Sequence, residues 1–338
     1  MTKNTWKTGF ALTIIASLLI GCGDSDDSGV SAASLYTGPT EEIVLDSTNA
    51  TSLVNNAVAA TSSASSIDPS SALFKSSLSK EQPTIIRIAE FVKDAATNRL
   101  SSLSSKPIIS GVTQSIDENC DVTGSFSATV TMVDQYTFFS QGDSISASYS
   151  NCSDDGIETL NGSISLTFSS VSGDEYSGGA YELGMTMSLN NFTTSSSTES
   201  FVGHGDLTMV MGTDAASISY FTMSGSELYT FDGSREMLLE DYRLATTSDW
   251  GVETTSDIDM TIASTDLGGS ITIETTTPLS TLGWDSNPSS GSMTFTGANS
   301  AKVKLDVIDN ASVTISWDVD PIDGDYEGSS TVASSTVF

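Results

Sequence analysis

Apolar residues recur at every second position over most of the chain after residue 125. The alternation runs through 126–132, 145–149, 164–168, 181–189 and 207–211, and it resumes at 258–262, 271–273, 303–307 and 313–317. Ser and Thr fill most of the positions in between. A period of two gives each strand one buried and one solvated face, which is typical of antiparallel sheets.

Turn sequences separate these segments, among them "DDG" at 154–156, "FDGS" at 231–234 and "IDGD" at 322–325. A dozen or more strands in about 225 residues exceed what a simple sandwich needs. The pattern therefore predicts a mainly β protein, in which a large antiparallel meander forms a curved sheet or a barrel-like domain.

Helical periodicity appears only before this β region. The stretch 83–103 begins with Pro83 and places apolar residues three and four apart, at Ile85, Ile88, Ala89, Val92, Ala96, Leu100 and Leu103. A weaker pattern, "SLVNNAVAA", covers 52–60. We expect one or two α-helices in front of the sheet.

The first 21 residues have the features of a secretion signal. Lys3 and Lys7 precede an apolar run of about a dozen residues, which is shorter than the roughly 20 that a membrane-spanning helix needs. The run ends in Leu19, Ile20, Gly21 and Cys22, which resembles the lipobox of bacterial lipoproteins. A plain secretion signal with a chance cysteine is the alternative.

The resemblance implies that Cys22 receives lipid and becomes the first residue of the mature chain. Lipid chains hold a soluble domain on a membrane because each buried methylene contributes about 0.8 kcal/mol. Gly23 follows the cysteine, and the resemblance then implies an outer-membrane protein that faces the periplasm or the cell surface. We expect a signal peptide at 1–21, a flexible tether at 22–44, a helical segment at 45–108 and the β domain at 109–338.

A second resemblance covers roughly a quarter of the chain. The stretch 288–328, with "KVKL", a "DN" turn and an Asp/Gly-rich loop, looks like the C-terminal part of a group of β-rich proteobacterial outer-membrane lipoproteins. The segments "FSQGDSISASYSNC" and "ETLNGSISLTF" are similar to the same group. This resemblance implies a recurrent β scaffold on a lipid anchor and no particular activity.

The charge balance is strongly acidic. Without residues 1–21 the chain keeps 10 basic and 43 acidic side chains, a formal charge of −33. Nucleic acid is excluded as a partner, because phosphate binding needs clustered Lys and Arg. The membrane, which the chain contacts through the N-terminal lipid, is the expected partner. An envelope protein and an apolar ligand are further possible partners.

Cys120 and Cys152 remain after Cys22 is assigned. In an oxidising envelope compartment such a pair predicts one disulfide. Cys and His residues are too few near them for zinc.

The acidic loop near the C-terminus is a candidate calcium site. Asp318, Asp320, Asp323 and Asp325, with Glu327, supply carboxylates, and calcium takes six to eight oxygens. The spacing does not match an EF-hand, and a hairpin turn made by Asp and Gly is the favoured reading. We therefore expect no cofactor, with calcium as the open alternative.

Two further residue types bear on function. His204 is the only histidine, no "GxSxG" motif occurs, and we expect an ordinary loop residue rather than a catalytic base. Methionine occupies many inward positions of the strands, namely Met132, Met185, Met187, Met209, Met211, Met223, Met260 and Met293. Methionine fills irregular cores, which is the favoured reading, and it also lines surfaces that adapt to varied apolar ligands.

Together these patterns predict a lipid-anchored cell-envelope protein that acts as a structural or binding module and is not an enzyme. The alternative is a carrier that holds a lipid or another apolar ligand in a methionine-lined cavity.

Overall fold

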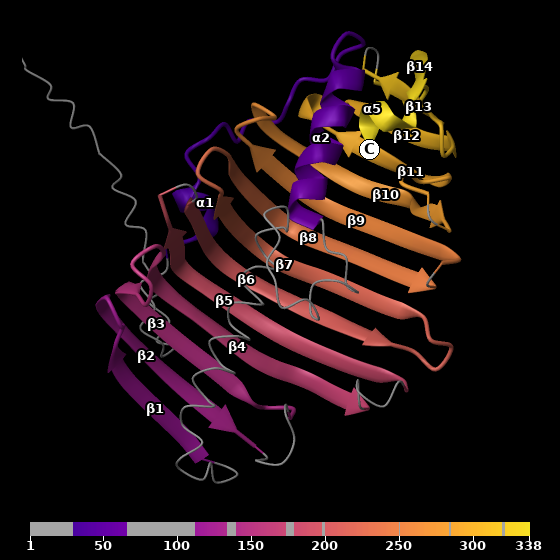
Figure 1. Cartoon of the computed structure of the whole chain (residues 1–338). Helices are drawn as coiled ribbons and strands as arrows, with labels where there is room; N and C mark the ends of the chain where they lie inside the picture. The colour runs from indigo at the N-terminus through magenta and orange to yellow at the C-terminus, as the bar shows by residue number, and fades with distance from the viewer. Residues whose placement is uncertain are drawn as a thin grey trace, which may run out of the picture. The chain divides into compact units, whose positions relative to one another are not determined.

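Fourteen strands form one antiparallel sheet, in the order in which they occur along the chain (Figure 1). The structure is a computed structural model that describes residues 30–65, 112–133, 140–173, 179–197, 200–249, 251–283, 285–319 and 322–338. The sheet belongs to a unit formed by residues 31–338. The predicted mainly β fold and its meander topology are confirmed.

The strands are long in the middle of the sheet and short towards its C-terminal edge. They are β1 (Val112–Asn119), β2 (Thr123–Met132), β3 (Ser144–Ser153), β4 (Thr159–Gly173), β5 (Tyr181–Ser195), β6 (Ser200–Thr213), β7 (Ser219–Phe231), β8 (Glu236–Asp249), β9 (Glu253–Ser264), β10 (Gly269–Leu282), β11 (Ser290–Thr296), β12 (Lys302–Asp309), β13 (Ser312–Asp318) and β14 (Gly328–Ala333). A short 3-10 turn, η2 (Ala298–Ser300), lies between β11 and β12.

Within the described residues the sheet is open, because β1 and β14 are its two edges and do not pair with each other. Of the two predicted forms, the structure has the curved sheet rather than a closed barrel. Sequence alternation does not decide closure, since strands of an open sheet and of a barrel alternate in the same way.

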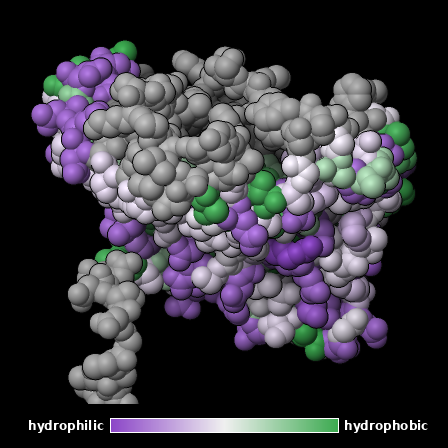
Figure 2. Space-filling model, turned by 90° about the horizontal axis from the view of Figure 1, so that it is seen from below, coloured by the Kyte–Doolittle hydropathy of each residue, from purple (hydrophilic) through white to green (hydrophobic). Residues whose placement is uncertain are grey.

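The main core lies on one face of the sheet, which we call the inner face. Its side chains come from alternate positions of the strands, for example Phe126 of β2, Met187 of β5 and Ile315 of β13. The opposite, outer face carries mainly Ser and Thr, some of them paired across strands, such as Thr113 with Thr131 at 3.0 Å. Large exposed hydrophobic side chains such as Val122 and Ile157 lie in turns. Accordingly, hydrophobic residues are scattered on the face shown in Figure 2.

A line of β-bulges crosses the sheet from β2 to β9. The register shifts at the level of Asn151 in β3, Asn191 in β5 and Asp241 in β8, and each of these residues has a left-handed backbone with φ between 46° and 48°. Short polar side chains tolerate this conformation better than others. A bulge bends its strand and increases the local twist, so bulges at one level in neighbouring strands bend the sheet along that line.

Side chains of neighbouring strands accept hydrogen bonds from two of the bulged backbone amides. The N–H of Asn151 donates to Oδ1 of Asn161 at 2.7 Å, and the N–H of Asn191 donates to Nδ1 of His204 at 3.1 Å. An amide that leaves the strand ladder at a bulge needs another acceptor. Asn161 and His204 supply it from β4 and β6.

A helix covers the inner face at the C-terminal end of the sheet. This helix, α2 (Ala50–Ser65), buries Leu53, Val54 and Ala57, and it contacts β12, β13 and the short terminal helix α5 (Ser334–Val337). The weaker of the two helical predictions, 52–60, is thus confirmed and extends to Ser65. The stronger one, 83–103, lies outside the described residues, as do 66–108 of the predicted helical segment.

The chain from Ser31 to Asn49 passes from the outer face to the inner face. The short helix α1 (Ala32–Leu35) and Tyr36 pack on Tyr229, Leu238 and Ala263 of the outer face. The chain then pairs with β10 through Glu42 and Ser270 before α2 begins. A free tether over 22–44 is therefore wrong from Ser31 onward, because these residues are held on the sheet.

Two carboxylates hold this crossing segment on the outer face. Glu227 accepts a hydrogen bond from the N–H of Ala33 at 3.4 Å, and Glu236 accepts one from the N–H of Thr37 at 2.9 Å. Burial, together with the negative charge of Glu236, raises the pKa of Tyr36 to about 12.

Candidate functional site

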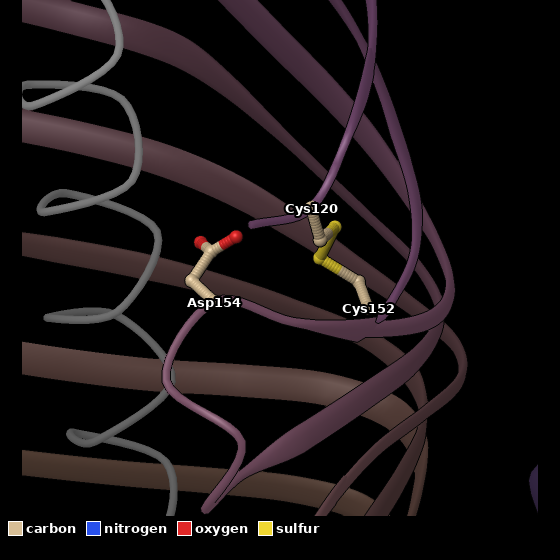
Figure 3. Close-up of side chains that lie close together, drawn as sticks. All are labelled: Cys120, Cys152 and Asp154. Carbon is tan, nitrogen blue, oxygen red and sulfur yellow. A yellow bond between two sulfur atoms is a disulfide. The ribbon is translucent and has the colours of Figure 1, made fainter. Parts of the chain in front are cut away.

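The two cysteines of the β domain are joined, as the sequence predicts. Cys120 follows β1, Cys152 lies in β3, and their disulfide has a Cα–Cα distance of 5.5 Å (Figure 3). Asp154 lies beside the bridge, and its carboxylate accepts a hydrogen bond from the N–H of Asp121 at 3.1 Å. Since both thiols are used in the disulfide, Cys120, Cys152 and Asp154 do not form a metal site, although their ligand atoms lie within 4.8 Å of one another.

The acidic loop brings together a different set of carboxylates from the predicted one. Oxygens of Asp318, Asp323 and Glu327 lie within 4.8 Å of one another, and Asp325 is not part of this group. Asp320 lies outside the described residues.

Most of this loop's carboxylates already accept backbone hydrogen bonds. Asp318 is only 2% exposed and accepts the N–H groups of Asp323 at 3.3 Å and Gly324 at 2.9 Å. Glu327 accepts the N–H of Val319 at 3.2 Å. These bonds build the turn around Gly324, whose φ is +94°. The geometry therefore favours the interpretation that these carboxylates stabilise a hairpin turn, and calcium binding stays a prediction.

The role of Asp318 in the turn leads to a stability prediction. Replacing Asp318 by Asn removes the negative charge and one of its two acceptor oxygens, so we expect the free energy of unfolding to fall by about 1–3 kcal/mol. Urea unfolding in the presence of EDTA measures this loss without a metal contribution. Asp325→Asn, at an exposed carboxylate of the same loop, is the control, and an equal loss in both variants would contradict the assignment.

His204 has a structural role in a strand rather than a position in a loop, which corrects the sequence prediction. It lies in β6, and its Nδ1 accepts the hydrogen bond from the bulged amide of Asn191. An acceptor Nδ1 carries no proton, so the neutral ring holds its proton on Nε2. The nitrogen that would act as a base is thereby used by the backbone.

The predicted inward methionines lie on the inner face. Seven of the eight are buried, none more than 7% exposed, and Met132 is half-buried. Met237, which the alternation did not identify, joins them from β8. The buried methionines come from β5 to β9 and from β11, and they belong to one core cluster with Ile271 and Ile273 of β10. A core filled with methionine has this arrangement, and an adaptable apolar binding site would have it too.

A polar hollow of about 480 Å³ lies over β1, β2 and β3, and sequence reasoning missed it. The register places Asp117, Ser127 and Ser148 in one row across the three strands, and Asn119, Ser125 and Ser150 in the next. The row between them consists of Glu118, Phe126 and Tyr149. The rings of Phe126 and Tyr149 lie in the inner core, with their centroids 5.1 Å apart.

Alternation along each strand then determines how this hollow is built. Because neighbouring residues point to opposite faces, the six side chains of the two rows project from the outer face and the backbone between them forms the floor. We call this depression the serine hollow. The only signal in the sequence was the recurrence of Ser at outward positions, which is ordinary for a solvated sheet face.

The predicted lipidation residue, Cys22, lies outside the described residues. Among the described helices, none is both long enough and apolar enough to cross a membrane. Comparison of the chain with protein-family models, curated proteins and solved structures finds no match.

Proposed function

We propose that the protein is a lipid-anchored cell-envelope protein whose β domain acts as a binding module and not as an enzyme. The anchor would be Cys22, and only residues 23–30 would separate it from Ser31, where the chain joins the sheet. The outer membrane is the proposed location, with the domain in the periplasm or on the cell surface.

The serine hollow is the observation that carries the binding part of the proposal. Its volume lies in the range of sites that hold small molecules, about 300–1,000 Å³. Its outer-face side chains supply a carboxylate, an amide and four hydroxyl groups, all of which donate or accept hydrogen bonds, while Glu118 of the intervening row points to the other face. In contrast, the only histidine is engaged with the backbone, which argues against nucleophilic catalysis that needs a histidine base.

Replacement of Cys22 by Ala tests the anchor. We expect labelled palmitate on the wild-type chain but not on Cys22→Ala, and we expect the wild type in outer-membrane fractions and the variant in soluble ones. Cys120→Ala is the matched control because it also removes a cysteine and leaves the predicted anchor intact. Label on neither chain, or label on both, would reject the anchor. Protease treatment of intact cells then distinguishes a surface domain from a periplasmic one.

A carrier of an apolar ligand is the second candidate, and the buried methionines of the inner face, which come from β5 to β9 and β11, favour it. Native mass spectrometry of the detergent-solubilised chain is the test, because a carrier retains lipid during purification. We expect a non-covalent mass increment equal to a lipid, beyond the mass of any covalent anchor and lost on denaturation, if this candidate is correct. Equal masses under native and denaturing conditions, after purification from native membranes, would contradict it.

A further inference from the structure

The serine hollow lies in a half of the sheet that has no positive charge. From Val112 to Phe231 the sequence contains fifteen acidic residues and no Lys or Arg. The described basic side chains, Arg235, Arg243, Lys302 and Lys304, all follow β7. A surface of one sign raises the local concentration of ligands of the opposite sign. The charges of the described residues around the hollow therefore favour a cation and disfavour an anion.

The walls of the hollow show which kind of cation would fit. Asp117 is exposed at one edge and offers the only carboxylate among the outer-face side chains of the hollow. Asn119 and the four serines are neutral and exchange hydrogen bonds in both directions. A simple metal ion would bind the carboxylate and leave most of the hydroxyl groups without a ligand partner. A ligand with one ammonium and several hydroxyl groups could form an ion pair with the carboxylate and hydrogen bonds with the hydroxyl groups.

Covalent and backbone links fix the width of the hollow. Cys120 follows Asn119 directly, and Cys152 lies two residues after Ser150, so the disulfide ties β1 to β3 across the end of β2. The N–H of Val122 also donates to the carbonyl of Ser153 at 2.9 Å. A site held in place before the ligand arrives loses less conformational entropy on binding.

From these observations we propose that the serine hollow binds a protonated amino sugar. The ammonium group pairs with the carboxylate of Asp117, and the ring hydroxyls exchange hydrogen bonds with Asn119 and with the serines of β2 and β3. The inference rests on the proposed binding function and names its ligand class. A neutral sugar keeps the hydroxyl contacts but loses the charge-assisted hydrogen bond, which is the stronger kind.

Ligand-observed NMR with glucosamine tests this proposal on the full chain in detergent. At about pH 6 the amine is protonated, because amines beside electron-withdrawing groups have pKa values near 7.7. We expect saturation transfer to glucosamine with a dissociation constant on the order of 1 mM, and at least tenfold weaker binding of glucose and N-acetylglucosamine.

Two matched variants separate the site from the general field. Asp117→Asn should reduce glucosamine affinity about tenfold, to the level of glucose. Asp121→Asn removes the same charge from the same end of the sheet but outside the hollow, and affinity should stay within about twofold because exposed charges are screened. No transfer to glucosamine, or an equal loss in both variants, would overturn the proposal.

The anchor experiment distinguishes a failure of this inference from a failure of the proposed function. If the chain carries palmitate at Cys22 and fractionates with the outer membrane but does not bind glucosamine, only the proposed ligand class is rejected. If the chain binds glucosamine but carries no lipid, only the proposed lipid anchor is rejected.

Discussion

Replacement of Phe192 by Ala is expected to lower the free energy of unfolding by about 3–5 kcal/mol. Phe192 of β5 is fully buried and belongs to the inner-face core, where its ring lies edge-on to Tyr149 with the centroids 6.0 Å apart. Removal of the ring loses its transfer free energy and leaves a cavity that β-sheet neighbours cannot fill without breaking register. Urea unfolding followed by far-UV circular dichroism measures the loss.

Two further variants make the Phe192 prediction specific. Phe192→Leu keeps most of the apolar volume, so its loss should be well below that of the alanine variant. Thr186→Ala changes an exposed outer-face residue of the same strand and should leave stability nearly unchanged. If Phe192→Ala and Thr186→Ala have the same small effect, the inner face of β5 is not packed as described.

The sequence predicts strands correctly where alternation runs without a break. Met185, Met187 and Leu189 occupy alternate, odd-numbered positions, and all three lie on the inner face of β5. After the bulge at Asn191 the parity changes, and the next inward residue is Phe192. Alternation in the sequence no longer predicts the inward residues beyond a bulge, because the extra residue turns every later side chain to the other face.

The strands that the sequence missed show the same cause. In β8 the inward residues are Met237 and Leu239 before the bulge at Asp241, and Tyr242 and Leu244 after it. In β7 the parity changes between Met223 and Leu228. Neither segment shows one sustained alternation, so neither was identified as a strand. β1, β11 and β14 carry only two apolar residues each, which is too few for the pattern to emerge. β12 and β13 are about as short, but each has three apolar residues in alternation.

The candidate sites were predictable to different degrees. The disulfide followed from the number of cysteines and the expected compartment, without any structural information. In the acidic loop the sequence shows that carboxylates are frequent but not which way each side chain points. The structure places Glu327, rather than Asp325, with Asp318 and Asp323. The serine hollow depends on the register of three strands, which places Asp117 beside Ser127 and Ser148. Register between strands is a tertiary property that alternation within a strand does not contain.

The double variant Cys120→Ala/Cys152→Ala is expected to lose about 3–4 kcal/mol of stability. The bridge closes a loop with a sequence separation of 32 residues, and the chain-entropy model gives this magnitude for such a loop. Since the disulfide joins β1 to β3 at an edge of the sheet, the loss should be greatest there. Amide hydrogen exchange should accelerate in β1 and β2 more than in β12 and β13, which are far from the bridge along the sheet.

The same double variant connects stability to binding. Without the bridge, Asn119 and Ser150 are no longer held at a fixed separation, so glucosamine should bind more weakly even under conditions where the chain stays folded. Dithiothreitol treatment of the wild type should reproduce the effect, while the double variant should not respond to it. Uniform exchange along the whole sheet would contradict the local role of the bridge. Unchanged glucosamine affinity in a folded double variant would show that the hollow does not depend on the disulfide for its shape.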